Sequence, residues 1–169
     1  AVELQQLGYL VLCQRLGREQ VQGLGVALHR RAHHRQGVAQ RFAGGGGRDD
    51  GDVLAALAAV PRHIFVEEAL ASRAYEDTAL PLGFAQTISQ PYIVARMIEV
   101  LRSGRELGRT LEVGAGCGYQ AAVLAQLTDE VYAVERIGPL LAKAKANMRT
   151  IQQFKVRLKH ADGQWGLPE

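Results

Sequence analysis

Three glycines stand at every second position in "LEVGAGCGYQ": Gly114, Gly116 and Gly118 follow a short apolar run and precede a stretch with a helical pattern. A turn from a buried strand into the start of a helix needs residues that tolerate positive φ, and glycine also lets the backbone approach a ligand closely. The dinucleotide-binding pattern G-x-G-x-x-G is broken, because Tyr119 stands where its third glycine would be. We therefore predict a ligand-binding loop, and a pyrophosphate cradle is its weaker interpretation.

An acidic residue at the end of the next apolar run indicates a nucleoside ligand. The run "VYAVE" ends at Glu135, where a carboxylate can accept hydrogen bonds from both hydroxyls of a ribose. The following run, "KVRLKHADG", ends at Asp162 and Gly163. Since ligands of open α/β sheets bind at the carboxyl ends of the strands, we expect these residues to converge on one ligand. The alternative is that the glycines only make a tight turn and that Glu135 is a solvated charge.

A parallel sheet is needed to bring these residues together. Strand-like runs are "RTLEV", "EVYAVE" and "KVRLK", and helical patterns cover residues 119–127 and 139–148 between them. This alternation predicts an α/β fold, a Rossmann-like doubly wound parallel sheet with right-handed crossovers. Upstream we expect a short helix after "RDDGD", an irregular stretch over residues 80–89 and a helix that begins near Pro91. From residue 2 to about 22, apolar residues recur at roughly helical spacing.

Composition favours one globular domain, since 47% of the 169 residues are hydrophobic, 22% are charged and the net charge is +3. Basic residues gather in "HRRAHHRQGVAQRF" without interleaved aromatic residues. We therefore prefer a solvated basic segment to an RNA-binding patch, and no nucleic-acid partner is expected. No carboxylate or cysteine joins His29 and His33, so no metal is expected. The apolar run at residues 9–13 is too short for a membrane span, and Cys13 and Cys117 follow no ligand or disulfide spacing. We expect a cytoplasmic monomer that binds no membrane.

Several longer motifs carry a more specific resemblance. "VPRH", "AYED", "LPLG" and "QTISQPYIVARM" precede "LEVGAGCGYQAAVLA", "VYAVERI" and "ADGQWGLPE". From about Asp52 to the last residue, the chain resembles the protein-L-isoaspartate O-methyltransferase family of class I S-adenosylmethionine-dependent methyltransferases. The resemblance implies protein repair: a methyl group passes from S-adenosyl-L-methionine to the carboxylate of L-isoaspartyl residues in damaged proteins and peptides, and S-adenosyl-L-homocysteine is left.

The same resemblance implies which residues act. A carboxylate is already ionised at neutral pH, so in-line methyl transfer to it needs alignment and partial removal of water rather than a general base. The family's catalytic serine falls on Ser89, whose hydroxyl can orient the carboxylate; alternatively, Ser89 caps the helix that begins near Pro91. The resemblance places Thr87 and Ile88 beside the substrate. It places the following residues at the cofactor: Gln90, Pro91, Gly114, Ala115, Gly116, Gly118, Tyr119, Glu135, Arg136, Asp162 and Gly163.

The chain departs from the family pattern at single positions and at both ends. Ala85 stands where many bacterial relatives have glycine, and Cys117 stands where serine is common. Residues 1–47 match poorly and are expected to form a helical, basic segment with a glycine linker. Residues 48–169 are expected to form the methyltransferase domain, with substrate-side helices over 48–103 and a cofactor-binding βαβαβ unit over 104–169.

Relatives continue with further strands, one of which pairs beside the first strand of the unit. We therefore expect a sheet truncated at its C-terminus, with "RTLEV" at an edge. The alternative functions are an RNA or small-molecule methyltransferase that shares the cofactor half, and an inactive truncated fragment that only binds the cofactor.

Overall fold

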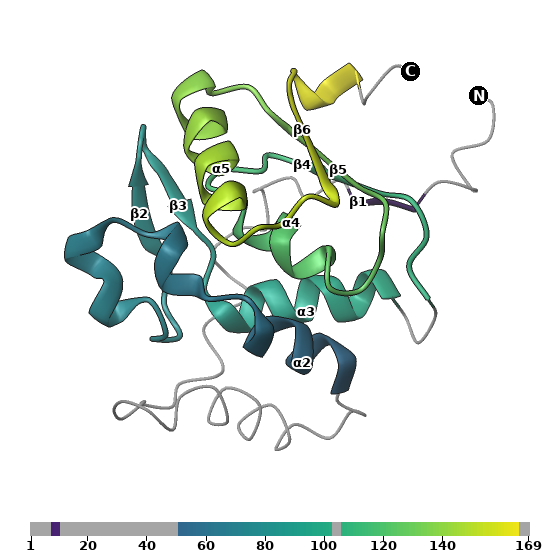
Figure 1. The fold of residues 1–169 in the computed structure, drawn as a ribbon, viewed down its shortest axis with the longest axis horizontal. Coiled ribbons are helices and arrows are strands. Elements are labelled where there is room, and N and C mark those ends of the chain that lie inside the picture. The colour runs from purple at the N-terminus through teal and green to yellow at the C-terminus, as the bar shows by residue number, and fades with distance from the viewer. Residues whose placement is uncertain (1–7, 11–50, 103–105, 166–169) are drawn as a thin grey trace, which may run out of the picture.

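The fold centres on a parallel sheet with strand order β1-β4-β5-β6 (Figure 1). The computed structural model describes residues 8–10, 51–102 and 106–165. The strands are β1 (Gly8–Leu10), β4 (Thr110–Val113), β5 (Val131–Glu135) and β6 (Val156–His160), and each neighbouring pair is parallel. The predicted α/β fold with a parallel sheet is therefore confirmed.

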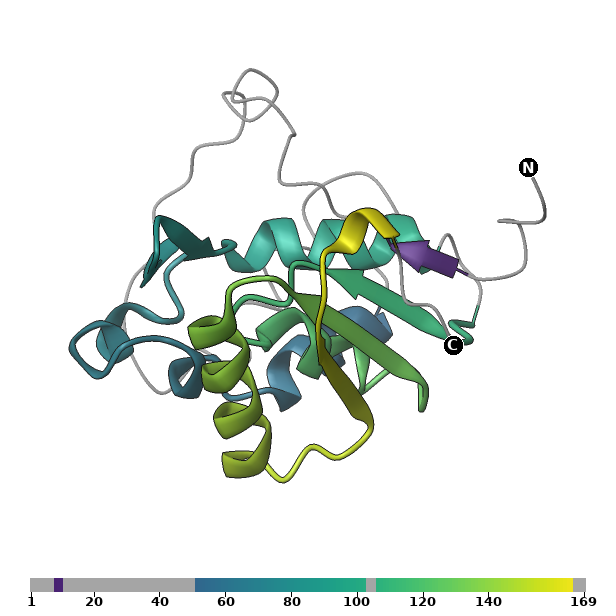
Figure 2. The same ribbon diagram turned by 90° about the horizontal axis from the view of Figure 1, so that it is seen from above.

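Two helices connect the three strands that the sequence predicted. Helix α4 (Tyr119–Leu124) joins β4 to β5, and α5 (Gly138–Thr150) joins β5 to β6. Both connections step across the sheet in the same direction, so right-handed crossovers place both helices on one face, where α5 packs along β5 and β6 (Figure 2). Buried strand β5 is a nearly continuous apolar run, as is typical of a parallel strand covered on both faces.

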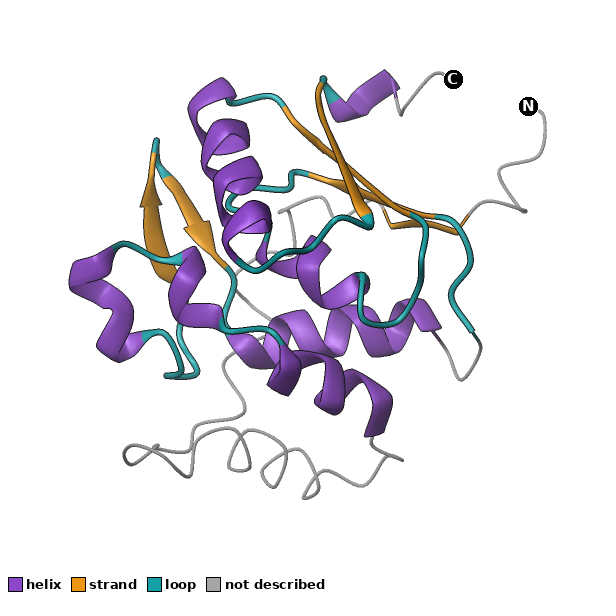
Figure 3. Cartoon of the chain, viewed as in Figure 1, coloured by secondary structure: helices purple, strands orange, loops and turns teal. Residues whose placement is uncertain are grey.

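The region before β4 supplies a second group of elements. Helix α2 (Gly51–Ala59) is followed by the short 3-10 helices η1 (Arg62–Phe65) and η2 (Glu68–Arg73), and helix α3 (Pro91–Arg102) begins at Pro91 as predicted. Between them, strands β2 (Leu80–Gly83) and β3 (Gln86–Ile88) form a hairpin separate from the main sheet (Figure 3). A third 3-10 helix, η3 (Gly163–Trp165), follows β6.

The hairpin corrects the expectation of an irregular stretch over residues 80–89. Its two turn residues, Phe84 and Ala85, have φ of 53° and 54°. Such a turn usually carries Asn-Gly or a similar pair, because positive φ strains other residues. The usual sequence pattern of a tight hairpin is therefore absent here, although the hairpin forms.

Strand β1 corrects two further expectations. Residues 8–10 are not helical: they pair with β4 in the register Gly8↔Thr110 and Leu10↔Glu112. The same pairing removes "RTLEV" from the edge of the sheet, whose edges in the described part are β1 and β6. A three-residue strand is too short to show a period of two, so periodicity could not distinguish it from a helix. The rest of residues 2–22, the basic segment and the glycines at 44–47 lie outside the described residues.

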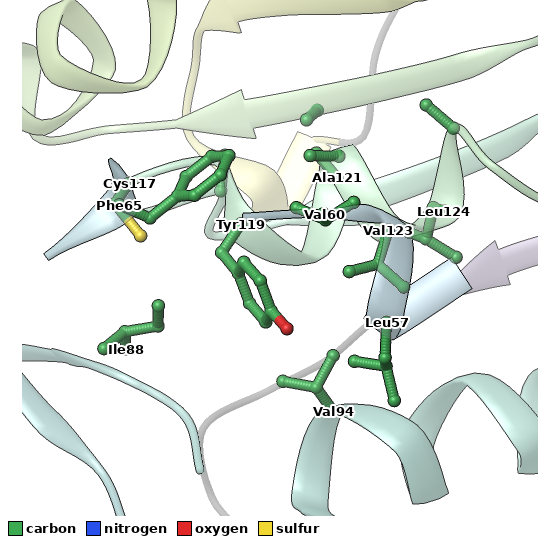
Figure 4. Packing of buried hydrophobic residues seen from close by; sticks show 14 of the residues in the cluster. Leu57, Val60, Phe65, Ile88, Val94, Cys117, Tyr119, Ala121, Val123 and Leu124 are labelled. Atoms are coloured by element: carbon green, nitrogen blue, oxygen red, sulfur yellow. The ribbon is translucent and has the colours of Figure 1, made fainter. Parts of the chain in front are cut away.

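The hydrophobic core lies where α2, α3, α4 and the hairpin meet. Figure 4 shows the Tyr119 side chain between Phe65 and Val94, and the Phe65 and Tyr119 rings make an edge contact with centroids 5.5 Å apart. Arg62 is also buried: its Nε donates to the Ala74 carbonyl at 2.7 Å, and its guanidinium carbon lies 4.7 Å from the Tyr119 ring centroid. This packing fixes the first residue of α4, directly after the glycine loop. Among the described helices, none is long and apolar enough to span a bilayer.

Candidate active site

A cavity of about 680 Å³ opens at the carboxyl ends of β4, β5 and β6 and reaches the hairpin and α3. Its volume is in the range of small-molecule binding sites. Most of the residues that the sequence predicted for the site line it: Thr87, Ile88, Ser89, Gly114, Ala115, Gly116, Tyr119, Glu135, Arg136, Asp162 and Gly163. Gln90, Pro91 and Gly118 are not among its lining residues.

The glycine loop is held against the end of β5 by its backbone. The amides of Gly114 and Ala115 both donate to the Val134 carbonyl, at 2.9 and 3.0 Å. Gly114 has a φ of +86°, and a Cβ added there would meet nothing within 4 Å, so the loop leaves open space beside its backbone. A Cβ at Gly118, whose φ is +88°, would lie 2.9 Å from the Met148 Cε atom. Gly118 therefore permits close packing on α5 and does not face the cavity.

Glu135 lies at the end of β5 and is only 5% exposed. Its Oε2 accepts a hydrogen bond from the Gly116 amide and its Oε1 accepts one from the Ile137 amide, both at 2.8 Å. An ionised carboxylate offers about four acceptor positions, so capacity remains for hydroxyl groups of a ligand. Glu135 thus organises two loops at the cavity, and its contact with a ribose stays a prediction.

Glu112 is a cavity residue that the sequence analysis missed. It is 3% exposed, and its Oε2 has no hydrogen-bond partner among the described residues. Burial, and then the nearby charge of Glu135, raise the pKa of Glu112 to about 8. The sequence did contain a clue: an acidic residue inside an otherwise apolar, buried strand has no obvious structural use.

Strand β3 leads directly into the residues predicted to hold the substrate. Thr87 is exposed, Ile88 is buried and Ser89 is partly exposed at the cavity. The alternative that Ser89 caps α3 is wrong, because the cap comes from Asp77, whose Oδ1 accepts a hydrogen bond from the Tyr92 amide at 2.9 Å. No hydrogen bond joins the Ser89 hydroxyl to another described residue, so this hydroxyl can bind a ligand.

The segment after β6 closes the far side of the cavity. Asp162 is exposed, and its Oδ1 accepts a hydrogen bond from the Gln164 amide at 3.0 Å. A Cβ at Gly163 would lie 2.0 Å from the Val113 Cγ1 atom, so only glycine fits against the end of β4. The contact of this segment with a base edge remains a prediction.

The cysteine of the glycine loop is inert at neutral pH. Cys117 is 2% exposed, and burial raises the pKa of its thiol to about 11. Its carbonyl accepts a hydrogen bond from the Asn147 side chain at 2.9 Å, which joins the loop to α5. Among residues 51–102 and 106–165, no three His, Cys, Asp or Glu side chains lie close enough to hold a metal ion.

Comparison with known proteins identifies the family. The family model for protein-L-isoaspartate(D-aspartate) O-methyltransferase (PCMT) matches residues 39–169. The chain belongs to the protein-L-isoaspartate O-methyltransferase family. The motifs that suggested the resemblance all lie within the matched residues. The cavity therefore lies in a chain whose family is named for methyl transfer.

Three relatives, each named protein-L-isoaspartate O-methyltransferase, show how much of the family this chain contains. The relative from Dechloromonas aromatica (strain RCB) is 82% identical over 118 residues, which are 69% of this chain and 55% of the relative. The relative from Azoarcus sp. (strain BH72) is 67% identical over 78% of this chain and 61% of its own length. The relative from Methylobacillus flagellatus is 57% identical over 87% of this chain and 64% of its own length. The chain thus spans less than two thirds of the length of these relatives.

Solved structures of the protein-L-isoaspartate O-methyltransferase family share the fold. One superposes with a TM-score of 0.68 at 26% identity and covers 79% of this chain and 44% of that protein. A second, a beta-aspartate methyltransferase from Plasmodium falciparum, superposes with a TM-score of 0.60 at 23% identity and covers 80% of this chain and 64% of that protein. The second structure was solved in complex with S-adenosyl-L-homocysteine.

Proposed function

We propose that this chain carries the cofactor and acceptor sites of a protein repair enzyme, which transfers a methyl group from S-adenosyl-L-methionine to the carboxylate of L-isoaspartyl residues. One observation carries the proposal: loop residues 114–117, Glu135 and the segment that ends in Ser89 line a single cavity. A donor and an acceptor bound there would meet, as a displacement reaction requires. Membership of the family supports the choice of reaction.

The residues present fit a cationic nucleoside cofactor. The backbone at Gly114 is open to close approach, Glu135 retains acceptor capacity for ribose hydroxyls, and Asp162 lines the same cavity with a carboxylate that can accept a hydrogen bond from a base. The unpartnered oxygen of Glu112 adds a buried acceptor that suits a positively charged group. S-adenosyl-L-methionine, when bound, would supply an electrophilic methyl group on a sulfonium. The relative solved with S-adenosyl-L-homocysteine supports this choice of cofactor.

The acceptor side needs a group that orients an anion. In our proposal the Ser89 hydroxyl donates a hydrogen bond to the isoaspartyl carboxylate, and Thr87 and Ile88 contact the neighbouring substrate atoms. Ser89 lies two residues before Pro91, the first residue of helix α3, and the N-terminus of a helix favours negative charge. Because the carboxylate is already ionised, Ser89 has to position it and has no proton to remove.

The test compares two peptides that differ only in one residue, isoaspartate in one and aspartate in the other. The chain is incubated with methyl-labelled S-adenosyl-L-methionine and each peptide, and base-labile methyl esters are counted. Label on the isoaspartyl peptide alone is the expected result. Equal label on both peptides contradicts the acceptor assignment. Absence of label on either peptide, with label from a version extended to the full length of its relatives, would show that this chain by itself does not turn over.

The division of roles gives a separate prediction about binding. Glu135→Ala should raise the dissociation constant of the cofactor at least tenfold, because it removes the proposed ribose contact and both hydrogen bonds that hold the loops. Ser89→Ala should leave that constant within about twofold, since Ser89 is assigned to the acceptor. Calorimetric titration of both variants measures the two constants, and the reverse order would contradict the assignment.

We further propose that the protein acts as a cytoplasmic monomer on damaged polypeptides. Cys117 is a buried, free thiol, which supports a reducing compartment. Sedimentation equilibrium of the purified chain at two concentrations tests the monomeric state, because a monomer gives a mass near 18.4 kDa at both.

A further inference from the structure

Two glutamates on neighbouring strands face the same cavity. Parallel pairing aligns Glu112 with Ala133, and Glu135 lies two residues beyond Ala133 on β5. Because strand side chains alternate between the two faces with a period of two, Glu112 and Glu135 project from the same face of the sheet. Both line the cavity and both are at most 5% exposed.

The two carboxylates differ in their hydrogen bonds. Each oxygen of Glu135 accepts a bond from a backbone amide, and an N–H donor requires an acceptor. Glu112 Oε2 receives no hydrogen bond from the described residues. A proton added to this pair therefore fits on Glu112, where it displaces no hydrogen-bond donor that is already present. The pKa of Glu112, raised to about 8 by burial and then by Glu135, agrees with this placement.

No other group of the described wall neutralises Glu112. Helix α3 contributes only apolar side chains, those of Ile93, Val94 and Met97. The thiol of Cys117 and the phenol of Tyr119 are both protonated at neutral pH, since burial raises their pKa values to about 11 and about 12. The remaining ionisable lining groups, Arg136 and Asp162, are exposed at the surface of the cavity and have opposite charges.

We propose that Glu112 holds a proton while the cavity is empty and releases it to solvent when the methionyl ammonium group of the cofactor occupies the cavity. The inference rests on the proposed cofactor. It adds that binding of the cofactor exchanges the proton on Glu112 for the ammonium group of the ligand. Glu112 is neutral in the empty state, so no uncompensated charge is buried, and it is ionised in the loaded state, where the ammonium pairs with it.

The exchange makes binding depend on pH in a defined direction. Below about pH 8 the empty site must give up a proton, so the association constant rises about tenfold per pH unit as the pH increases. Above about pH 8 Glu112 is already ionised and its contribution to the pH dependence ends. A ligand without the ammonium group displaces no proton at any pH.

The experiment is calorimetric titration with S-adenosyl-L-homocysteine in buffers of different ionisation enthalpy, which counts the protons released on binding. The wild-type chain is compared with Glu112→Gln, and Glu130→Gln, outside the cavity, is the matched control. At pH 7 the amino group of the ligand is protonated both free and bound, so the difference between wild type and Glu112→Gln reports Glu112. We expect this difference to be about one proton at pH 7, while Glu130→Gln behaves as wild type.

Two further measurements keep the outcome decisive. 5′-Methylthioadenosine, which lacks the ammonium group, should bind with no proton release. Carbon-13 titration of labelled glutamates should show one carboxyl group with a titration midpoint near pH 8, and this titration should be absent from Glu112→Gln. Binding of S-adenosyl-L-homocysteine at pH 7 with no difference in proton release overturns the inference and leaves the proposed cofactor intact. Failure of both nucleosides to bind folded wild-type protein overturns the proposed cofactor and the inference together.

Discussion

At the scale of single residues, alanine substitutions at Gly114 and Gly118 distinguish the cost of backbone strain from the cost of a steric clash. Both have φ near +87°, but only Gly118 has neighbours where a Cβ would stand, with the Ala144 Cβ at 3.3 Å and the Met148 Cε at 2.9 Å. Gly114→Ala should lower the free energy of unfolding by about 1–2 kcal/mol through φ alone. Gly118→Ala should lower it by about 1–3 kcal/mol more. Urea denaturation measures both, and equal losses would contradict a packing role for Gly118.

Glu112 also gives a prediction about stability. The pKa of Glu112 is about 8 in the folded chain, against 4.5 for an ordinary glutamate. At any pH between these two values, Glu112 is therefore ionised in the unfolded chain and protonated in the folded chain. The free energy of unfolding should therefore fall as pH rises from 5 to 8, by on the order of 3 kcal/mol, and level off above pH 8. Glu112→Gln should remove this slope. Urea denaturation of both proteins at pH 5, 6.5 and 8 measures it, and parallel curves would show that Glu112 ionises normally.

The contrast between Glu135 and Glu112 shows what a sequence can reveal about a site. Glu135 was predicted because an acid at a strand end is a known partner of a glycine loop. Glu112 was missed because its importance depends on an oxygen without a partner, and hydrogen bonding is a property of the folded chain. The alternative that Ser89 caps α3 failed for a similar reason, since the capping residue, Asp77, lies 15 positions before Tyr92.

At the scale of elements, Asp77 fixes the start of α3, the helix that follows β3 and Ser89. Asp77→Ala should lower the free energy of unfolding by about 1 kcal/mol, because the Tyr92 amide loses its acceptor and the helix N-terminus loses a favourable charge. Asp129→Ala is the control: its carboxylate pairs with Lys155 in an exposed ion pair, and such pairs contribute little. Thermal melting of both variants is the measurement. A loss at Asp129 as large as that at Asp77 would contradict the capping role.

Long, strongly patterned elements were predictable and the short ones were not. The parallel strands, α5 and the start of α3 at Pro91 follow from apolar runs, helical spacing and a favourable first residue. The hairpin was missed because Phe84 and Ala85 occupy a turn that normally needs glycine. At position 85 φ is +54°, a conformation that glycine adopts without strain.

At the scale of the whole molecule, β1 covers one side of β4 with a segment from the far N-terminus. Leu10→Pro removes a backbone donor that lies next to Leu111 in the register and restrains φ, so it should weaken the pairing and speed hydrogen exchange of the Leu111 and Val113 amides. Leu10→Ala keeps the backbone amide and should leave exchange there within about threefold of wild type. Hydrogen exchange read by mass spectrometry compares the two. Unchanged protection in Leu10→Pro would show that β4 does not depend on β1.

The buried thiol of the glycine loop has a consequence for the chemistry that this site can survive. With a pKa of about 11, Cys117 is a thiolate in only about one molecule in ten thousand at pH 7, and only 2% of the residue is exposed. Peroxide and alkylating agents react with accessible thiolates, so neither should label the loop while the chain is folded. The glycine loop should therefore keep its cysteine reduced under oxidative conditions for as long as the chain stays folded.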